Sequence, residues 1–138
     1  MFGGDGNDFL SGGRGVDLLS GGAGADTFRF IQSGPTDDPD YDSGVGAGNR
    51  DRILDFHSTE GDHIPLVMDA NITTADFDPF HFVGRIVPNQ ALLTGQVGWF
   101  ESNGSTIVTA NTHAGSGSTF QIQLDGVSLG LKASDFSS

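Results

Sequence analysis

The chain has 138 residues and a formal net charge of −12, with 6 basic residues, 18 acidic residues and no cysteine. This length suits one domain of ordinary size, or a small repeat unit joined to one sandwich. The lack of cysteine excludes disulfides and thiolate metal sites. The few scattered basic residues make nucleic acid an unexpected partner, and no apolar run is long enough to span a membrane.

A nine-residue pattern repeats three times without a gap in residues 3–29. Its form is Gly-Gly-x-Gly-x-Asp-x-apolar-x, with aspartates at Asp8, Asp17 and Asp26. The glycines allow tight turns that expose carbonyl oxygens, and each aspartate adds a carboxylate to the same turn. Oxygen ligands of this kind suit Ca2+. The apolar residue two places after each aspartate would point inward from a short strand, so the repeats must stack to bury it. A flexible glycine-rich linker would not keep this register.

These repeats resemble the calcium-binding nonapeptides of the RTX proteins, which wind into a right-handed parallel β-roll. In that family two nonapeptides make one turn, and the loops of repeats n and n+2 share an ion. The resemblance implies that repeats one and three hold one Ca2+ through Asp8, Asp26 and backbone carbonyls. The site around Asp17 is then open, or is completed by residues after Arg29 or by repeats that have been lost. The candidate ligand positions are Gly3, Gly4, Asp5, Gly6, Asp8, Gly12, Gly13, Arg14, Gly15, Asp17, Gly21, Gly22, Ala23, Gly24 and Asp26.

Two segments flank the repeats. Met1 and Phe2 fit the last two positions of a preceding nonapeptide, so we expect the chain to start inside a repeat, although Met1 equally fits a native start. A strand is expected at residues 27–31, followed by an acidic surface loop at residues 37–44. The aspartates of this loop have EF-hand spacing, but Asn49 stands where a bidentate glutamate is needed.

Strands are expected at residues 51–56 and 63–68, with a turn between them. The sequence Asp51-Arg52-Ile53-Leu54-Asp55-Phe56, together with Gly61-Asp62, resembles the segment that follows the roll in the C-terminal domain of serralysin metalloproteases. In those relatives acidic residues here bind a further Ca2+, which makes Asp51 and Asp62 candidate ligands. Capping of a turn is the alternative role for both. Pro65 stands where relatives carry Asp, and this removes one carboxylate.

The C-terminal half alternates polar and apolar residues between Asn, Gly and Ser turns, as antiparallel sheet does. A short helical turn is expected at residues 73–77. Expected strands are 80–83, 97–100, 106–109, 120–124 and 127–129. This half also resembles the serralysin C-terminal domain, and residues 131–138 resemble the segment that type I exporters read. Asp135-Phe136 fits that signal, whereas Ser137 and Ser138 depart from it.

No catalytic motif is present in the sequence. H-E-x-x-H is missing, and the pair His57 and His63 lies around a turn at Gly61 rather than on one helix face, which disfavours zinc. No G-x-S-x-G elbow occurs. Trp99 and Phe100 would suit stacking on a sugar, but packing in the core explains them more simply.

Together these features predict an all-β chain. A parallel β-roll of nonapeptide repeats over residues 1–34 would be continuous with an antiparallel β-sandwich-like cap over residues 35–138. The resemblance implies a calcium-binding, calcium-folded, non-catalytic C-terminal module of a larger secreted extracellular protein, a protease or other hydrolase. Its partners would be calcium ions, the type I secretion machinery and an upstream catalytic or adhesive domain. The alternative is a polysaccharide-binding module like the roll of an alginate epimerase.

Overall fold

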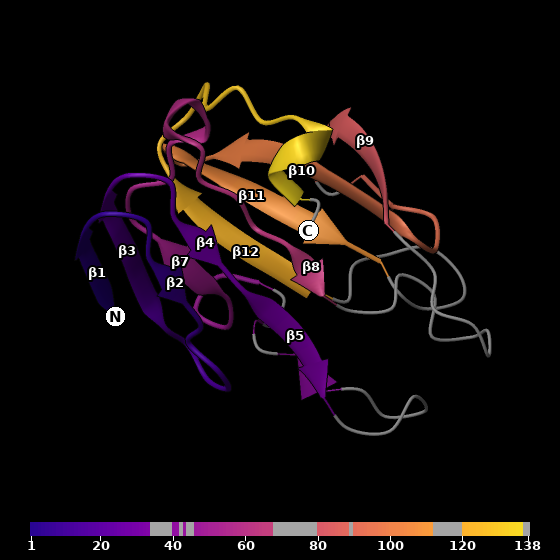
Figure 1. Cartoon of the computed structure of the whole chain (residues 1–138). Helices are drawn as coiled ribbons and strands as arrows, with labels where there is room; N and C mark the ends of the chain where they lie inside the picture. The colour runs from indigo at the N-terminus through magenta and orange to yellow at the C-terminus, as the bar shows by residue number, and fades with distance from the viewer. Residues whose placement is uncertain are drawn as a thin grey trace.

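The computed structural model describes residues 1–33, 40–41, 43, 46–67, 80–88, 90–111 and 120–136 (Figure 1). These residues form strands and two short 3-10 helices and contain no α-helix, so the prediction of a mostly β chain is confirmed. None of their helices is long and apolar enough to cross a membrane. The elements are β1 (Phe2–Asp5), β2 (Phe9–Leu10), β3 (Leu18–Ala23), β4 (Thr27–Phe28), β5 (Phe30–Ser33), β6 (Asp40–Tyr41), β7 (Asp51–Ile53), η1 (Ser58–Glu60), β8 (Leu66–Val67), β9 (His81–Arg85), β10 (Gln96–Ser102), β11 (Ser105–Ala110), β12 (Phe120–Asp125) and η2 (Ala133–Phe136).

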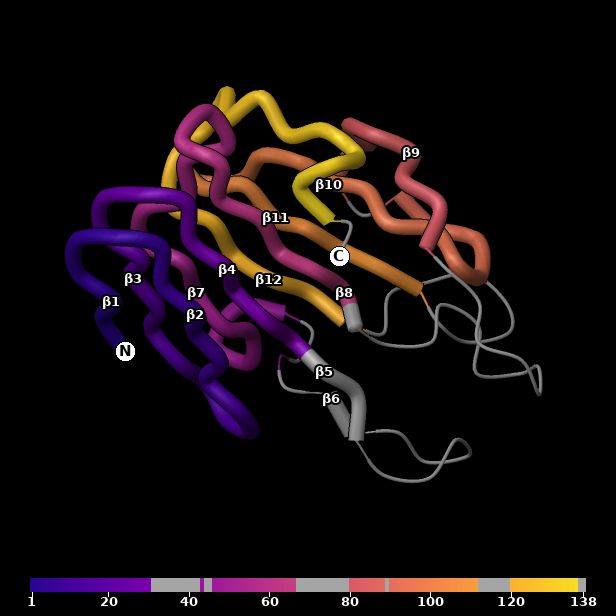
Figure 2. The backbone as a smooth tube through the Cα atoms, in the orientation of Figure 1, coloured from indigo at the N-terminus to yellow at the C-terminus, as the bar shows by residue number. Residues whose placement is uncertain are grey.

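The repeats wind as a coil in which two nonapeptides make one turn. Strand β1 pairs in parallel with β3, with Phe2 opposite Ser20, and β2 pairs in parallel with β4, with Phe9 opposite Thr27. Both registers are shifted by two nonapeptides, so the pairing follows the repeat period. Figure 2 shows the chain passing through β1, β2, β3 and β4 in succession.

A third turn of the coil is built by residues that lack the repeat pattern. Strand β7 pairs in parallel with β3, β8 pairs in parallel with β5, and His63 forms a parallel bridge with Thr27. Ile53 and Ile64 are fully buried. Each lies two positions after an aspartate, as the buried apolar residues of the repeats do. The column of buried apolar side chains predicted from the nonapeptides therefore continues beyond the repeats.

The C-terminal strands extend the coil's own sheet. Seven strands lie in the order β1-β3-β7-β12-β11-β10-β9. Strands β10, β11 and β12 are antiparallel as predicted, whereas β12 runs parallel to β7 and β9 runs parallel to β10. The sheet is therefore mixed. The predicted strand at residues 127–129 is wrong, because Ser128 adopts a left-handed φ of 56° and donates its N–H to Glu101.

One hydrophobic core joins the repeats to the C-terminal strands. Phe30 lies after the third repeat and packs edge-to-face on Phe120 of β12, with ring centroids 5.8 Å apart. Both residues are fully buried in the cluster that also contains Leu10 and Leu19. Phe136 belongs to the same cluster and stacks on Phe82 of β9. The coil and the C-terminal sheet thus each cover apolar surface of the other, so we expect them to fold cooperatively.

Other expected elements are shorter than predicted or fall outside the described residues. The strand expected at 27–31 is divided into β4 and β5, and the strand expected at 63–68 is reduced to β8 after the bridge at His63. The helical turn at 73–77, most of the acidic loop at 37–44 and the last two residues lie outside the described part of the chain.

Candidate metal centre

The repeat loops need glycine for two different reasons. Gly22 and Gly24 have φ values of 98° and 129°, where a side chain is strained. Gly3 has an ordinary φ, but a Cβ there would lie 2.5 Å from the carboxylate of Asp8. Gly21 has the same relation to Asp26. Each aspartate therefore folds back over the first glycine of its own repeat and directs its carboxylate into the turn.

The aspartates form two stacks across successive turns of the coil. The N–H of Asp8 donates to Oδ1 of Asp26 at 2.9 Å, and the N–H of Asp26 donates to Oδ1 of Asp62 at 2.9 Å. On the other side, the N–H of Asp17 donates to Oδ1 of Asp51 at 2.8 Å. The two stacks are separated by the six residues of β3, about 20 Å of strand. Asp51 and Asp62 therefore cannot ligate the same ion.

Each repeat leaves one carboxylate oxygen buried without a hydrogen bond. These atoms are Oδ2 of Asp8, Asp17 and Asp26. Asp26 has no exposed surface at all. An unpaired carboxylate oxygen held away from water is costly unless a cation or donor compensates it. The repeats thus present the electrostatic environment that a bound cation would stabilise.

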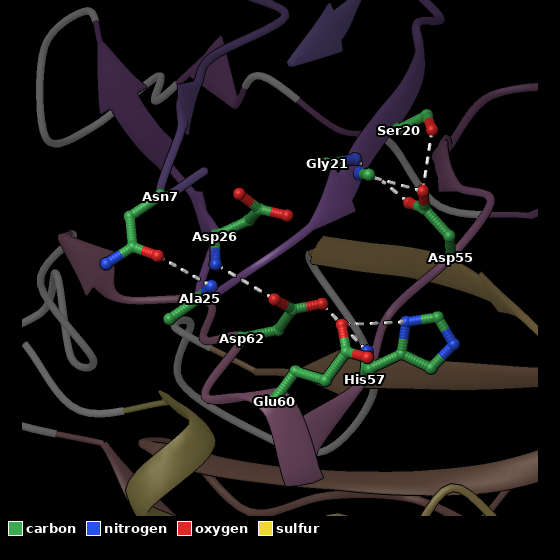
Figure 3. A network of polar contacts seen from close by, with 10 residues as sticks. Asn7, Ser20, Gly21, Ala25, Asp26, Asp55, His57, Glu60 and Asp62 are labelled. Carbon is green, nitrogen blue, oxygen red and sulfur yellow. Dashed lines mark hydrogen bonds and ion pairs between the residues drawn. The ribbon is translucent and has the colours of Figure 1, made fainter. Parts of the chain in front are cut away.

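Oxygens of repeats one and three converge where their loops stack. The Cβ position at Gly3 lies 2.5 Å from Oδ2 of Asp8 and 2.6 Å from the carbonyl oxygen of Gly21. A Cβ on Gly22 would overlap the carbonyl oxygen of Gly4. Asn7 Oδ1 accepts the N–H of Ala25 at 3.0 Å and ties the loops together (Figure 3). Carboxylate and carbonyl oxygens around one small volume are the ligands that Ca2+ prefers.

Repeat two is partnered by the loop of residues 46–51. Strand β7 aligns Arg52 with Leu18, which brings Asp51 beside Asp17, and Asp51 is fully buried. Of the expected alternatives for the loop of repeat two, the structure thus places residues after Arg29 beside it. The loop is not a true repeat, because its positive-φ glycines occupy different places relative to the aspartate. Its signal in the sequence is two closely spaced glycines followed by Asp-x-Ile.

Asp55 ends the ladder of backbone hydrogen bonds on β3. Pairing of β3 with β7 stops at Leu19, and the Asp55 carboxylate then accepts the N–H groups of Gly21 and Gly22 and the hydroxyl of Ser20 (Figure 3). The Asp55 side chain thus accepts the hydrogen bonds that the backbone of a neighbouring strand would otherwise accept. Sequence reasoning missed this role, although Asp55 stands in the segment that resembles the serralysins.

Asp62 closes the longer stack in a desolvated position. Its Oδ1 accepts the N–H of Asp26, and its Oδ2 accepts the N–H of His57 at 2.8 Å. Burial is the largest cause of a raised pKa for Asp62, and the neighbouring Asp26 charge also raises it, whereas the two hydrogen bonds and the His57 charge lower it. A cation beside the two carboxylates would relieve both effects.

Side chains alone do not complete a metal site in the described residues. The described part of the chain contains no group of three or more His, Cys, Asp or Glu residues placed to share an ion. His57 instead lies 3.8 Å from Glu60, and His63 lies 3.5 Å from the Thr27 hydroxyl. Any ion held at the stacked loops therefore needs backbone carbonyls among its ligands, which is what the glycine turns supply.

The C-terminal turn η2 packs against the loop that carries Asp62. Ser58 donates its hydroxyl to Asp135 at 2.8 Å, and Lys132 donates to Ser58 at 2.6 Å. Asp135 is almost fully buried, and a cavity of about 360 Å3 beside these residues also reaches Asp62. The predicted export-signal residue Asp135 is thus part of the folded structure.

Replacing Ser58 by Ala should lower the free energy of unfolding by about 1 kcal/mol, because it removes one hydrogen bond to a buried carboxylate. Lys132 still lies 3.3 Å from Asp135 and limits the loss. Urea unfolding in saturating Ca2+ measures the change. A Thr59→Ala variant, at an exposed neighbouring position, should behave as the unchanged chain. Equal stability of all three proteins would show that the contact contributes nothing.

Residues 1–29 match the family described as "RTX calcium-binding nonapeptide repeat (4 copies)". No curated protein matches the chain. The match contains all three glycine loops and the aspartates Asp8, Asp17 and Asp26, and it ends before the two non-repeat loops that stack on them. Repeats of this kind bind calcium and are typical of type I secreted bacterial proteins.

Proposed function

We propose that this chain is a calcium-binding module whose folding is coupled to the binding of the ion. The supporting observation is the set of buried, unpartnered Oδ2 atoms in stacked loops, above all those of Asp8 and Asp26. Without a cation the stacked carboxylates repel one another and are poorly solvated. With Ca2+ bound, the coil closes as a parallel β-roll, so that the free energy of binding contributes to the free energy of folding.

The first ion would be held between repeats one and three. Asp8, Asp26 and carbonyl oxygens of the loops 3–6 and 21–24 supply hard oxygen donors, and bound Ca2+ supplies the positive charge that these loops lack. The Asp17 and Asp51 pair and the Asp26 and Asp62 pair are candidates for further ions. Each of these pairs combines one true repeat loop with one non-repeat loop, so we expect weaker binding there.

The wider role that we propose is a non-catalytic C-terminal module of a larger extracellular RTX protein, a protease or other hydrolase. It would be exported by type I machinery and have a serralysin-type C-terminal domain. Support comes from the repeats, from the resemblance of residues 51–62, and from the lack of a catalytic motif in the sequence. At low cytosolic calcium the repeats would stay open for export. Outside, at ~10⁻³ M Ca2+, the range of extracellular calcium modules, they would close.

The alternative role, binding of a polysaccharide, has less support. Trp99 is the aromatic residue on which a sugar would stack, but it packs against the core and lies under the guanidinium of Arg85, 5.5 Å from the ring centroid. An affinity gel containing alginate tests this role directly, and retarded migration would favour it.

Calcium titration of the EGTA-treated chain tests the proposed function. Far-UV circular dichroism should show a cooperative gain of β signal as Ca2+ is added, and EGTA should reverse it. Mg2+ at the same concentration should have a much smaller effect, because Mg2+ dehydrates reluctantly and requires near-octahedral ligands. A chain that is fully folded in EGTA and binds no Ca2+ by calorimetry would contradict ion-coupled folding.

A further inference from the structure

The C-terminal turn η2 is attached to the last turn of the coil through one residue, Asp135. The Asp135 carboxylate accepts the hydroxyl of Ser58 at 2.8 Å. Its backbone carbonyl oxygen accepts the N–H of Ile64. Both donors belong to residues 57–64, the segment that we call the Asp62 loop. Asp135 therefore holds this loop at two points, one near each end.

Apolar contacts fix the other side of η2. Phe136 is 7% exposed and stacks on Phe82 of β9, with ring centroids 5.4 Å apart. Leu131, which precedes the turn, belongs to the same hydrophobic cluster. The turn thus has an apolar side in the core and a polar side on the Asp62 loop.

The Asp62 loop is held by the coil as well. Asp62 accepts the N–H of Asp26 through Oδ1 and the N–H of His57 through Oδ2 (Figure 3). The carbonyl oxygen of His63 accepts the N–H of Phe28. The loop therefore contacts the aspartate stack and η2 at the same time. Whatever orders the loop for one of these contacts lowers the entropy cost of forming the other.

A cavity of about 360 Å3 lies where the Asp62 loop and the C-terminal segment meet, and Asp62, Lys132 and Asp135 are among the residues that line it. Lys132 lies 3.3 Å from Asp135 and compensates that carboxylate, whereas Asp62 is hydrogen-bonded to backbone N–H groups. A cation bound beside Asp62 would reduce the repulsion between the two carboxylates. The polar side of the contact, unlike the apolar side, can open without exposing the core.

We propose that η2 is a latch on the Asp62 loop, so that docking of the turn and ion binding at the pair of Asp26 and Asp62 stabilise one another. The inference rests on the proposed calcium function and deepens it, because it assigns the regulation of this ion to residues outside the repeats. The coupling is reciprocal by linkage. When no ion holds the loop, the turn is released more often, and the segment that resembles an export signal becomes accessible.

Proteolysis at lysine measures release of the turn, because Lys132 is the only lysine of the chain. A lysine-specific endoprotease can cut one bond, between Lys132 and Ala133, and mass spectrometry quantifies the product. In saturating Ca2+, Asp62→Asn should speed this cleavage at least about twofold, the lower end of coupling within one network. Asp17→Asn changes the stack on the other side of the coil and should be cleaved as the unchanged chain is. Equal cleavage rates for the two variants would overturn the latch.

A double-mutant cycle tests the coupling in the opposite direction. Asp135→Asn should raise the calcium concentration at the folding midpoint, because its NH2 group would face one of two donors, the Ser58 hydroxyl or the Lys132 N–H. Combined with Asp62→Asn, the increase should fall short of the product of the single effects by at least about twofold. Combined with Asp17→Asn, it should equal that product. Simple products in both pairs would refute the latch.

Far-UV circular dichroism in saturating Ca2+ shows whether each variant is folded. If Asp62→Asn does not fold, Asp62→Glu takes its place in both experiments, since it keeps the charge and displaces the carboxylate. An unchanged chain that folds with Ca2+ while both experiments find no coupling would leave the calcium function standing and remove the latch. An unchanged chain that neither binds Ca2+ nor gains β signal would contradict the calcium function itself.

Discussion

Replacing Asp26 by Asn should raise the calcium concentration at the folding midpoint more than any other single aspartate change. Asp26 lies in the middle of the longer stack, where its Oδ1 accepts the N–H of Asp8 and its own N–H donates to Asp62. Its carboxylate is fully buried and Oδ2 is unpartnered. Loss of outer-shell partners already weakens metal sites by about 10–100-fold. Loss of a direct ligand should cost at least as much.

Calcium titration followed by far-UV circular dichroism measures this midpoint. Glu60→Gln is the matched control, since it also removes one negative charge but at an exposed position outside the stacks. Its midpoint should stay close to that of the unchanged chain. Asp8→Asn should fall between the two, because Asp8 has a stacked partner on one side alone. A midpoint for Asp26→Asn equal to that of Glu60→Gln would remove Asp26 from the ligands.

Gly22→Ala should prevent the calcium-dependent fold or lower its thermal midpoint strongly. The left-handed φ of 98° disfavours any side chain by about 1–2 kcal/mol. The new methyl group would also overlap the carbonyl of Gly4 in the preceding loop, and that backbone cannot move without separating the two loops that hold the ion. Both effects act on a native state that is stable by only about 5–15 kcal/mol.

Thermal unfolding in saturating Ca2+ and in EGTA separates the two effects. Gly104→Ala has φ near 77° and open space around the new methyl group, so it should show the conformational strain alone. It should also keep the full stabilisation by Ca2+. Gly22→Ala should lose most of that stabilisation. If the two variants lose the same amount, the close approach of the loops does not matter for binding.

The strands of the C-terminal half could be located from the sequence, but not all of their pairings. Alternation predicted β10, β11 and β12, and the Asn, Gly and Ser residues between them made an antiparallel order expected. The parallel pairing of β12 with β7 joins segments far apart in the chain. The alternation of polar and apolar residues indicates which face of a strand is buried, but it does not indicate which strand lies next to it. Residues 127–129 alternate as well, yet they form no strand, because Ser128 adopts a left-handed backbone conformation.

The stacking of the loops of repeats one and three could be predicted from the sequence, whereas the contact of Asp17 with Asp51 and the role of Asp55 could not. In the repeats the aspartate, the glycines and the buried apolar residue lie within nine residues, so local geometry places them. Asp51 meets Asp17 across 34 residues, after an intervening segment that breaks the period. Asp55 replaces a strand at the end of β3. Residues that are close in the sequence specify neither of these two contacts.

By itself, the sequence determined the turn chemistry of residues 3–29, the column of apolar residues behind each aspartate, and calcium as the fitting ion. These follow from glycine's access to positive φ and from a period that repeats the same short-range contacts. Only the tertiary structure decided that residues 46–51 and 55–62 continue the aspartate stacks and that one sheet joins coil and C-terminal strands. It did so because burying Ile53, Ile64 and Phe120 in one core brings these distant segments into register.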